Sequence, residues 1–328
     1  MAQTPAAVPG AAPAQPAPQR PPRPGVTAPG VKREIGAIKP LAVFPVPGNP
    51  DWQAVTPDAV WVTSGRKNLV ARLDPKANTV VTLVETGTRP CSGLVAAFGS
   101  LWVPICGEAD KPATKGLQRI DLQTNKVVAT LPVGPALSEG GIAATADSVW
   151  LTSELKGILS RIDPETNRVV AEIDVPKGSS VTVVGEDKAV WVVSTEQSLV
   201  VRVDPQTNLI TDRIEVGPNP RFTTVGAGAI WTLNQGDGTI SRVDVKSRKL
   251  VTNIEVGVPG GGGEIAFGAG RVWVTVFEIP LTEIDPETNK VVKQWTGLGG
   301  DAVRVGHGSV WLSNIRQENV WRLDPKQP

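Results

Sequence analysis

The chain has 328 residues, and 33 lysines and arginines stand against 32 aspartates and glutamates, so the formal net charge is +1 at pH 7. Such a balance lacks the basic field that draws proteins to nucleic acids or anionic membranes, and we expect no nucleic-acid partner. No run of about 18 apolar residues occurs, so we expect no transmembrane segment. Two cysteines and one histidine are too few for a zinc site built from Cys and His ligands.

The N-terminal segment has a composition unlike the rest. Residues 1–32 are rich in proline and alanine and contain few large apolar side chains. Because such a segment cannot bury enough surface to offset chain entropy, we expect residues 1–33 to be a disordered tether and residues 34–328 to fold. The tether lacks the apolar region that a signal peptide contains. A start at Met-Ala-Gln fits a mature chain whose signal was removed, and we expect a periplasmic or secreted protein.

After this segment, an aliphatic residue followed by tryptophan recurs at intervals of roughly 40 residues, the length of one propeller blade. The seven tryptophans are Trp61, Trp102, Trp150, Trp191, Trp231, Trp273 and Trp311. Each is followed by a block of the form Arg-aliphatic-Asp, with glutamate in place of arginine at Glu283. The chain is therefore built from seven copies of one unit.

One unit, residues 179–216, illustrates the internal pattern. It contains four short segments, SSVTVV, AVWVVS, LVVRVD and LITDRIEV, which are rich in β-branched residues and bounded by turn residues. The turn of another unit, Asp163 to Asn167, places Asp, Pro and Asn where a tight turn needs them. Four antiparallel strands per repeat form one blade of a propeller. We expect an all-β fold, a seven-bladed β-propeller with four-stranded antiparallel blades.

The two ends of the folded part are complementary. The seventh unit stops at Asp324 and Pro325 without a fourth strand, whereas residues 41–47, LAVFPVP, resemble the fourth strand of other units. We predict that this N-terminal strand completes the last blade. The ring is then closed without an open sheet edge that could aggregate.

The tryptophan strand followed by R-[ILV]-D-P-x-T-N resembles the YVTN and virginiamycin B lyase-like superfamily of seven-bladed propellers. The resemblance covers nearly the whole chain outside the tether and implies the same fold. Its motif is structural and shared by members with unrelated activities, so it transfers little function. Lyases of the virginiamycin type, as the resemblance implies, use a histidine base with a metal-assisted carboxylate site. Here the single histidine, His307, is expected at the end of its strand opposite the mouth.

Residues that every blade repeats are explained by packing between blades, so we seek function where the copies differ. The innermost strand of a blade lines the channel, and its entry forms one mouth. The non-repeated residues expected there are Asp51, Trp52, Glu139, Arg221, Phe222, Glu264, Asp301 and Arg304. Aromatic faces and convergent charges suit a small polar or aromatic ligand. The alternative is a wet mouth whose charges pair among themselves.

These features favour a non-catalytic exported propeller, expected to be a monomer without cofactor, that binds a small ligand or a partner protein at the mouth. One alternative is a metal-assisted lyase or lactone hydrolase. It would use a divalent metal, with Arg221 or Arg304 stabilising developing anionic charge. The metal ligands or the base would come from Glu264, Glu139, Asp51 and Asp301, with Glu264 or Glu139 the candidates for the base. Another alternative is a structural interaction scaffold.

The second unit carries both cysteines. Cys91 opens its inner strand and Cys106 ends the next, so a tight turn places them opposite each other and predicts a disulfide. Two reduced thiols in a cytosolic protein are the alternative. The same unit is longer than the others by a loop, residues 106–116, which can carry specificity. The glycine-rich run at residues 259–263 is interpreted as a flexible turn, because no Lys-Ser/Thr follows it.

Overall fold

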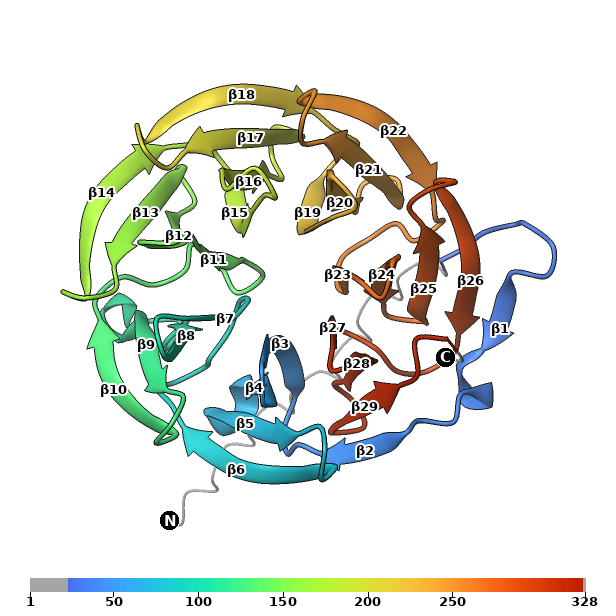
Figure 1. The fold of residues 1–328 in the computed structure, drawn as a ribbon, viewed down its shortest axis with the longest axis horizontal. Coiled ribbons are helices and arrows are strands. Elements are labelled where there is room, and N and C mark those ends of the chain that lie inside the picture. Colours follow the sequence, from blue (N-terminus) through green and yellow to red (C-terminus); the bar gives the residue numbers. More distant parts are fainter. Residues whose placement is uncertain (1–22, 327–328) are drawn as a thin grey trace, which may run out of the picture.

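The computed structural model describes residues 23–326, which form a ring of seven β-sheets around a central axis (Figure 1). Each sheet is one blade, with its innermost strand nearest the axis and its outermost strand at the rim. Neighbouring strands of the repeated unit are antiparallel. The all-β, seven-bladed propeller expected from the repeats is therefore confirmed.

The strands follow one another from the axis outward in each blade. Blades one to three contain β3 (Pro50–Thr56), β4 (Ala59–Ser64), β5 (Leu69–Asp74), β6 (Thr79–Glu85), β7 (Val95–Ala97), β8 (Ser100–Ile105), β9 (Gly116–Asp121), β10 (Lys126–Leu131), β11 (Ile142–Ala144), β12 (Val149–Glu154), β13 (Ile158–Asp163) and β14 (Arg168–Asp174). Blades four and five contain β15 (Ser179–Val184), β16 (Val190–Ser194), β17 (Leu199–Asp204), β18 (Leu209–Glu215), β19 (Pro220–Gly226), β20 (Ala229–Asn234), β21 (Thr239–Asp244) and β22 (Lys249–Glu255).

Blades six and seven contain the last repeats together with strands from the N-terminal part. Their strands are β23 (Glu264–Gly268), β24 (Arg271–Val276), β25 (Ile279–Asp285), β26 (Lys290–Thr296), β27 (Val303–Gly306), β28 (Ser309–Asn314) and β29 (Asn319–Leu323), with β1 (Lys32–Glu34) and β2 (Ala42–Pro45). Three short 3-10 helices of the described residues are η1 (Ile35–Ala37), η2 (Gly65–Lys67) and η3 (Pro112–Thr114).

The ring is closed by strand pairing between the two ends of the propeller. β2 is antiparallel to β29, with Ala42 opposite Arg322 and Pro45 opposite Asn319. The last blade therefore has the strand order β2, β29, β28, β27. The predicted closure by the N-terminal strand is confirmed.

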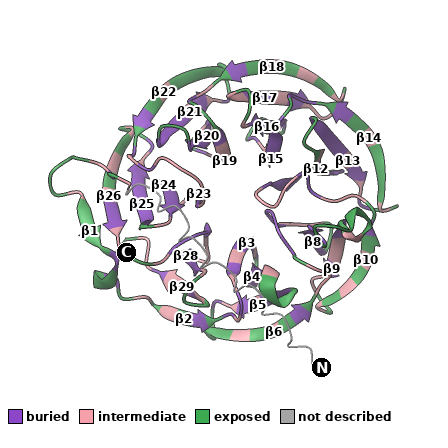
Figure 2. Ribbon diagram, turned by 180° about the vertical axis from the view of Figure 1, so that it is seen from behind, coloured by how far each residue is buried: buried purple, intermediate pink, exposed green. Residues whose placement is uncertain are grey.

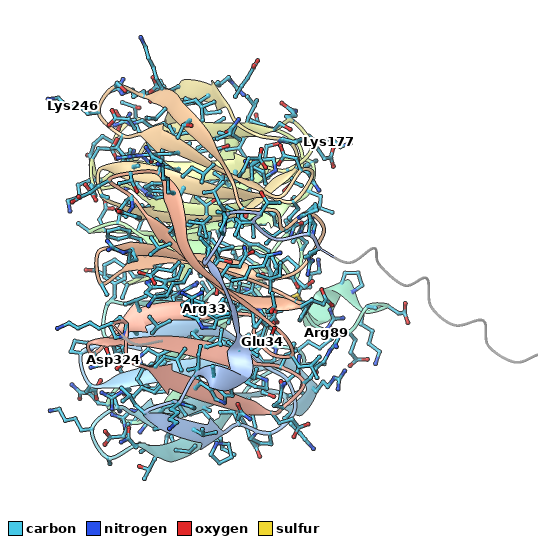
Figure 3. The ribbon with its side chains drawn as sticks, turned by 90° about the vertical axis from the view of Figure 1, so that its right-hand side faces the viewer. Arg33, Glu34, Arg89, Lys177, Lys246 and Asp324 are labelled. Atoms are coloured by element: carbon cyan, nitrogen blue, oxygen red, sulfur yellow. A yellow bond between two sulfur atoms is a disulfide. The ribbon has the colours of Figure 1, made fainter. Side chains whose placement is uncertain are left out.

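The chain before β2 adds a strand that the repeats do not contain. β1 runs parallel to β26 as a fifth strand of blade six, and Figure 3 shows Arg33 and Glu34 on this segment at the outside of the ring. Further upstream, the Arg23 guanidinium donates a 2.8 Å hydrogen bond to the carbonyl of Pro259. Residues 1–22 of the expected tether lie outside the described residues, whereas residues 23–33 lie along blade six because its edge strand offers backbone partners.

Burial is greatest in the second strand of a blade and least at the rim (Figure 2). All six residues of β20 are buried, whereas the outermost strand of the same blade, β22, has one buried residue. The second strands are covered on both faces by neighbouring blades, and they are buried almost throughout. The outer strands face solvent on one side and alternate accordingly.

The seven repeated tryptophans are at most 1% exposed. Each indole N–H donates to the turn that precedes its strand, as from Trp150 to the Thr145 hydroxyl at 2.9 Å and from Trp231 to the Gly226 carbonyl at 2.9 Å. The other five indole N–H groups donate to oxygen atoms of Thr56, Ala97, Asp187, Gly268 and Gly306. Their polar groups are thus satisfied within the scaffold, as buried indoles require.

The repeated arginine joins one blade to the next. Arg161 of blade three donates to the Pro205 carbonyl at 2.8 Å and to Asn208 Oδ1 at 3.1 Å, both in the turn of blade four. Its guanidinium carbon lies 5.1 Å from the centroid of the Trp150 ring. We call this set of contacts the arginine clamp. It recurs at Arg119, Arg242 and Arg322.

Three junctions of the described ring lack the arginine clamp. At the first, Arg72 of blade one binds Asp58, although the turn of blade two has Asn125. The other two coincide with departures from the motif. The turn of blade five has Arg248 in place of asparagine, and Arg202 of blade four instead binds Asp187 at 2.7 Å. In blade six Glu283 replaces the arginine and binds Arg271 at 3.1 Å. Where the clamp forms, the asparagine of the motif thus serves as an acceptor for the neighbouring blade, besides its left-handed φ of about 60° in such turns.

Cys91 and Cys106 form a disulfide, as predicted, with a Cα–Cα distance of 5.9 Å. Cys91 precedes β7 and Cys106 follows β8, and the Cys91 N–H donates to the Pro104 carbonyl at 3.0 Å. The bond joins the base of the inserted loop, residues 106–116, to the entry of the inner strand.

The arginine clamp predicts a specific loss of stability. Arg161→Ala removes two inter-blade hydrogen bonds and a cation–π contact, so we expect the free energy of unfolding to fall by roughly 1 to 3 kcal/mol. Denaturant unfolding measures it. Arg168→Ala is the matched control, because Arg168 is exposed on the outer strand of the same blade. Equal stability of the two variants would contradict the clamp.

The disulfide predicts a thiol count of zero in the denatured, non-reduced protein and two after reduction. The disulfide closes a loop of 15 residues. Reduction is expected to lower the free energy of unfolding by about 3 kcal/mol, because the unfolded chain gains conformational entropy when the loop is opened. Two free thiols before reduction would show that the bond does not form.

Candidate functional site

The ring has two faces that differ in the loops they carry. Figure 3 shows Arg89 and Lys177, which precede innermost strands, on one face, and Lys246 and Asp324, which follow third strands, on the other. We call the first the mouth face. The loop that contains η3 projects from the mouth face (Figure 3). The chain therefore enters the innermost strands at the mouth face, the end that the sequence predicted for these entries.

Four acidic residues from four blades meet at the mouth face. Asp51 lies in β3, Glu264 begins β23, and Glu139 and Asp301 precede β11 and β27. The carboxyl groups of Asp51 and Asp301 are hydrogen-bonded to each other. Glu139 and Glu264 are close enough to act on both electrostatically. We call the first two residues the aspartate pair.

Burial and like charge hold this pair protonated. The pKa of Asp301 is raised to about 7, first by burial and then by the charges of Glu139 and Glu264. The pKa of Asp51 is raised well above its ordinary value by burial, and then by the charges of its three acidic neighbours. Two carboxylates in hydrogen-bond contact cannot both ionise easily, so one proton is shared near neutral pH.

The two arginines at the mouth are each associated with a glutamate. Arg304 forms an ion pair with Glu264, whose second oxygen accepts the Val303 N–H at 3.1 Å. Burial raises the pKa of Glu264, and Arg304 opposes that shift. Burial likewise raises the pKa of Glu139, against the charge of Arg221. Among residues 23–326 no salt bridge involves either member of the aspartate pair.

The glycine-rich run serves the aspartate pair directly. The backbone of Gly263 is hydrogen-bonded to Asp301, which lowers the pKa of that carboxyl and partly offsets burial. Gly263 has a φ of 90°, and a Cβ there would lie 1.8 Å from the Thr275 carbonyl oxygen. Only glycine fits this position. The glycine-rich run therefore has a defined conformation at the rim, whereas the sequence indicated a flexible turn.

Two aromatic side chains meet across the axis of the ring. Trp52 of blade one and Phe222 of blade five have ring centroids 5.8 Å apart and are 4% and 1% exposed. Blades one and five are not neighbours, so this contact spans the axis. A cavity of about 60 Å³ borders these rings, with Glu264 and Arg304 also in its wall. Every blade contributes at least one residue to that wall.

Several buried polar atoms at this cavity have no hydrogen-bond partner within the described residues. They are the indole N–H of Trp52 and the hydroxyl groups of Thr182 and Thr223, all in the wall of the cavity. Trp52 contrasts with the seven repeated tryptophans, whose indole groups are all bonded. Buried polar groups in proteins nearly always have partners, so an unpartnered set marks a place for a polar ligand or water.

The residues present do not fit the histidine and metal chemistry that the resemblance implies. His307 lies in the turn at the far end of β27, where its Nε2 is 2.9 Å from the Thr56 carbonyl oxygen. Within the described part of the chain, no group of three or more His, Cys, Asp or Glu residues is arranged to hold a metal ion. Glu264 is bound by an arginine and a backbone N–H, which leaves it a poor metal ligand.

The sequence named all eight mouth residues, and the structure brings them to one end of the axis; their role in ligand binding stays a prediction. Reasoning from the sequence missed Thr182 and Thr223. Thr182 lies in β15 and Thr223 in β19, both innermost strands. Because alternate residues of such a strand face the channel, the strand pattern is the signal that could have indicated them. The proton shared by the aspartate pair has no sequence signal, because it depends on the distance between blades one and seven.

No family model matches the sequence, and no curated protein matches it. Solved structures do resemble it in fold. A streptogramin B lyase has 17% identity, covers 85% of this chain and 94% of its own, with a TM-score of 0.69. A catalytically inactive virginiamycin B lyase from Staphylococcus aureus, solved with quinupristin, has 16% identity, with coverage of 84% and 94% and a TM-score of 0.69.

A third similar structure has a different activity. Hydrazine synthase from Kuenenia stuttgartiensis has 14% identity, covers 86% of this chain and 97% of its own, with a TM-score of 0.71. These likenesses show the fold of a seven-bladed propeller of the virginiamycin B lyase type. None of the helices in residues 23–326 is long and apolar enough to cross a bilayer.

The raised pKa of Asp301 predicts a pH-dependent stability. An acid whose folded pKa is about 7 binds more protons folded than unfolded between pH 4 and 7, so its contribution falls as pH rises through that window. Asp301→Asn is expected to match the wild type near pH 4 and to exceed its free energy of unfolding at pH 8 by roughly 1 to 3 kcal/mol. Glu165→Gln, an exposed change, is the control. A constant difference across pH would contradict the assignment.

Proposed function

We propose that this chain is a non-catalytic, exported propeller that binds a small polar ligand at the mouth face. The observation that carries the proposal is the gathering of unrepeated charged and aromatic residues around a cavity with unpartnered polar atoms. Stability does not require such a gathering, because buried like charges and unpartnered donors both cost free energy. Ligand sites combine an apolar wall with a few convergent polar groups in this way.

A small ligand is favoured over a partner protein by the size and depth of the site. The cavity is about 60 Å³, and its aromatic wall is almost fully buried. A protein side chain could reach only the acidic rim above it. A scaffold role through the outer faces would leave the mouth residues unexplained.

Export is proposed on chemical grounds. The disulfide between Cys91 and Cys106 is of the kind that persists in the periplasm or outside the cell and is rare in a reducing cytosol. Its position at the base of the inserted loop supports the rim of the proposed site.

One observation favours an enzyme as the second candidate. A carboxyl group with a pKa of about 7, such as Asp301, can exchange a proton with a substrate near neutral pH. Virginiamycin B lyase, a similar fold, has been solved with quinupristin. The histidine and metal chemistry expected of that type has no counterpart at the mouth of this chain, so the binding function is the better supported.

The binding function predicts a ligand whose affinity depends on Trp52. A library of small polar compounds, screened by thermal shift at pH 6 and pH 8, is expected to give hits that raise the melting temperature. Trp52→Phe keeps the ring and removes the indole N–H, and we expect it to weaken such hits by about tenfold. Trp321→Phe, at a partly buried position on β29, is the matched control. Hits that bind Trp52→Phe unchanged, or no hits, would refute the site.

The non-catalytic assignment predicts no ring opening of quinupristin. Incubation of the protein with quinupristin and magnesium, followed by mass spectrometry, is expected to return the intact compound. Turnover that Asp301→Asn abolishes would establish the enzyme in place of the binding protein.

A further inference from the structure

The charges at the mouth do not cancel. The acidic groups there are Asp51, Asp301, Glu139 and Glu264, and the basic groups are Arg221 and Arg304. Each arginine is matched by one glutamate. The aspartate pair is left with no basic partner among the described residues, and only the shared proton and the backbone of Gly263 offset its charge there. A buried carboxylate without a cation is costly, so this position favours a bound positive charge.

The cavity at the axis, whose wall includes Glu264 and the residue that follows Asp51, offers hydrogen-bonding groups and a flat apolar surface. Trp52 and Thr182, which are 4% and 2% exposed, each present an unpartnered polar atom there. The indole group is a donor only, whereas a threonine hydroxyl both donates and accepts. A ligand that satisfies them carries a hydroxyl or another acceptor. At about 60 Å³ the cavity has room for roughly four small groups, at 10 to 15 Å³ for each water-sized group.

We propose that the mouth binds a small organic cation of the amino-alcohol class, with its ammonium group between Asp51 and Asp301 and its hydroxyl group against Trp52 and Thr182. This inference rests on the proposed function and names the ligand class of the same site. An ammonium group has three donors and suits two facing carboxylates. The aromatic rings of Trp52 and Phe222 cover its carbon atoms and add attraction for the cation.

Other ligand classes match the site less well. An anion would meet the acidic pair, and the arginine in the cavity wall, Arg304, is already paired with Glu264. A divalent metal needs several free oxygen ligands in a close shell, and the described residues contain no such group. A neutral diol would satisfy Trp52 and Thr182 and leave the aspartate pair as it is.

Binding of the cation exchanges it for the shared proton. The ammonium group enters with one positive charge, and the pair releases one proton to the buffer, so the net charge of the site is unchanged. Every group that faces the pair takes part in setting this exchange: Glu139 and Glu264 favour the proton or cation, and Arg221 and Arg304 oppose both. Affinity should therefore rise with pH until the pair is fully ionised.

The test uses 2-hydroxyethylammonium chloride as the probe and the full chain in titration calorimetry. With an Asp301 pKa of about 7, we expect the affinity to fall about tenfold per pH unit below pH 7, with up to one proton released per ligand in buffers of different ionisation enthalpy. Asp51→Asn/Asp301→Asn is expected to lose at least tenfold in affinity. Asp301→Asn alone keeps one carboxylate, so it should retain binding and move the pH dependence to lower pH.

The comparison ligands separate failure of this inference from failure of the proposed function. Ethylene glycol, glycolate and magnesium are titrated alongside the ammonium probe, with Glu165→Gln as the control variant. Binding of glycol or glycolate that depends on Trp52, without binding of the ammonium, would overturn the cation and keep the small-molecule site. Binding of magnesium alone, or ammonium binding that the double variant retains, would overturn the inference. No binding of any compound, here or in the library screen, would overturn both.

Discussion

In the described part of the chain, four of the seven junctions between blades are joined by a guanidinium group that reaches from one blade into the turn of the next. Each arginine clamp stacks on the tryptophan of its own blade and donates to a proline carbonyl and an asparagine side chain across the junction. It thereby ties the local turn, the blade core and the contact between blades into one interaction. The clamp from Arg322 to Asn78 spans the closure itself, beside the pairing of β2 with β29.

Because the repeated positions meet the needs of the scaffold, the unrepeated ones are free to diverge. The seven repeated indoles are all hydrogen-bonded, whereas that of Trp52 is not. Asp51 and Asp301 carry raised pKa values that no junction requires. A rigid ring can hold such groups in place at the axis, since it is supported from all sides. Local destabilisation of this kind is typical of binding sites.

The sequence predicted the fold, the closure, the disulfide and the residues at the mouth, because each depends on spacing along the chain. It did not predict that Arg161 contacts Asn208, that β1 joins blade six, or that Asp51 and Asp301 share a proton. These contacts join segments from 47 to about 260 residues apart. Their distances depend on the radius of the ring and the twist of its blades, which a repeat in one sequence does not encode.

The central claim is electrostatic: two aspartates of this chain share a proton near neutral pH because burial and the neighbouring acidic charges at the mouth raise their pKa values. Carbon-13 NMR of the side-chain carboxyl groups, recorded from pH 3 to pH 9 with labelled aspartate, measures this directly. The account predicts two coupled signals that titrate late, that of Asp301 with a pKa of about 7 and that of Asp51 with a pKa well above its ordinary value, and both absent in Asp51→Asn/Asp301→Asn. Titration of every aspartate below pH 5 would contradict it.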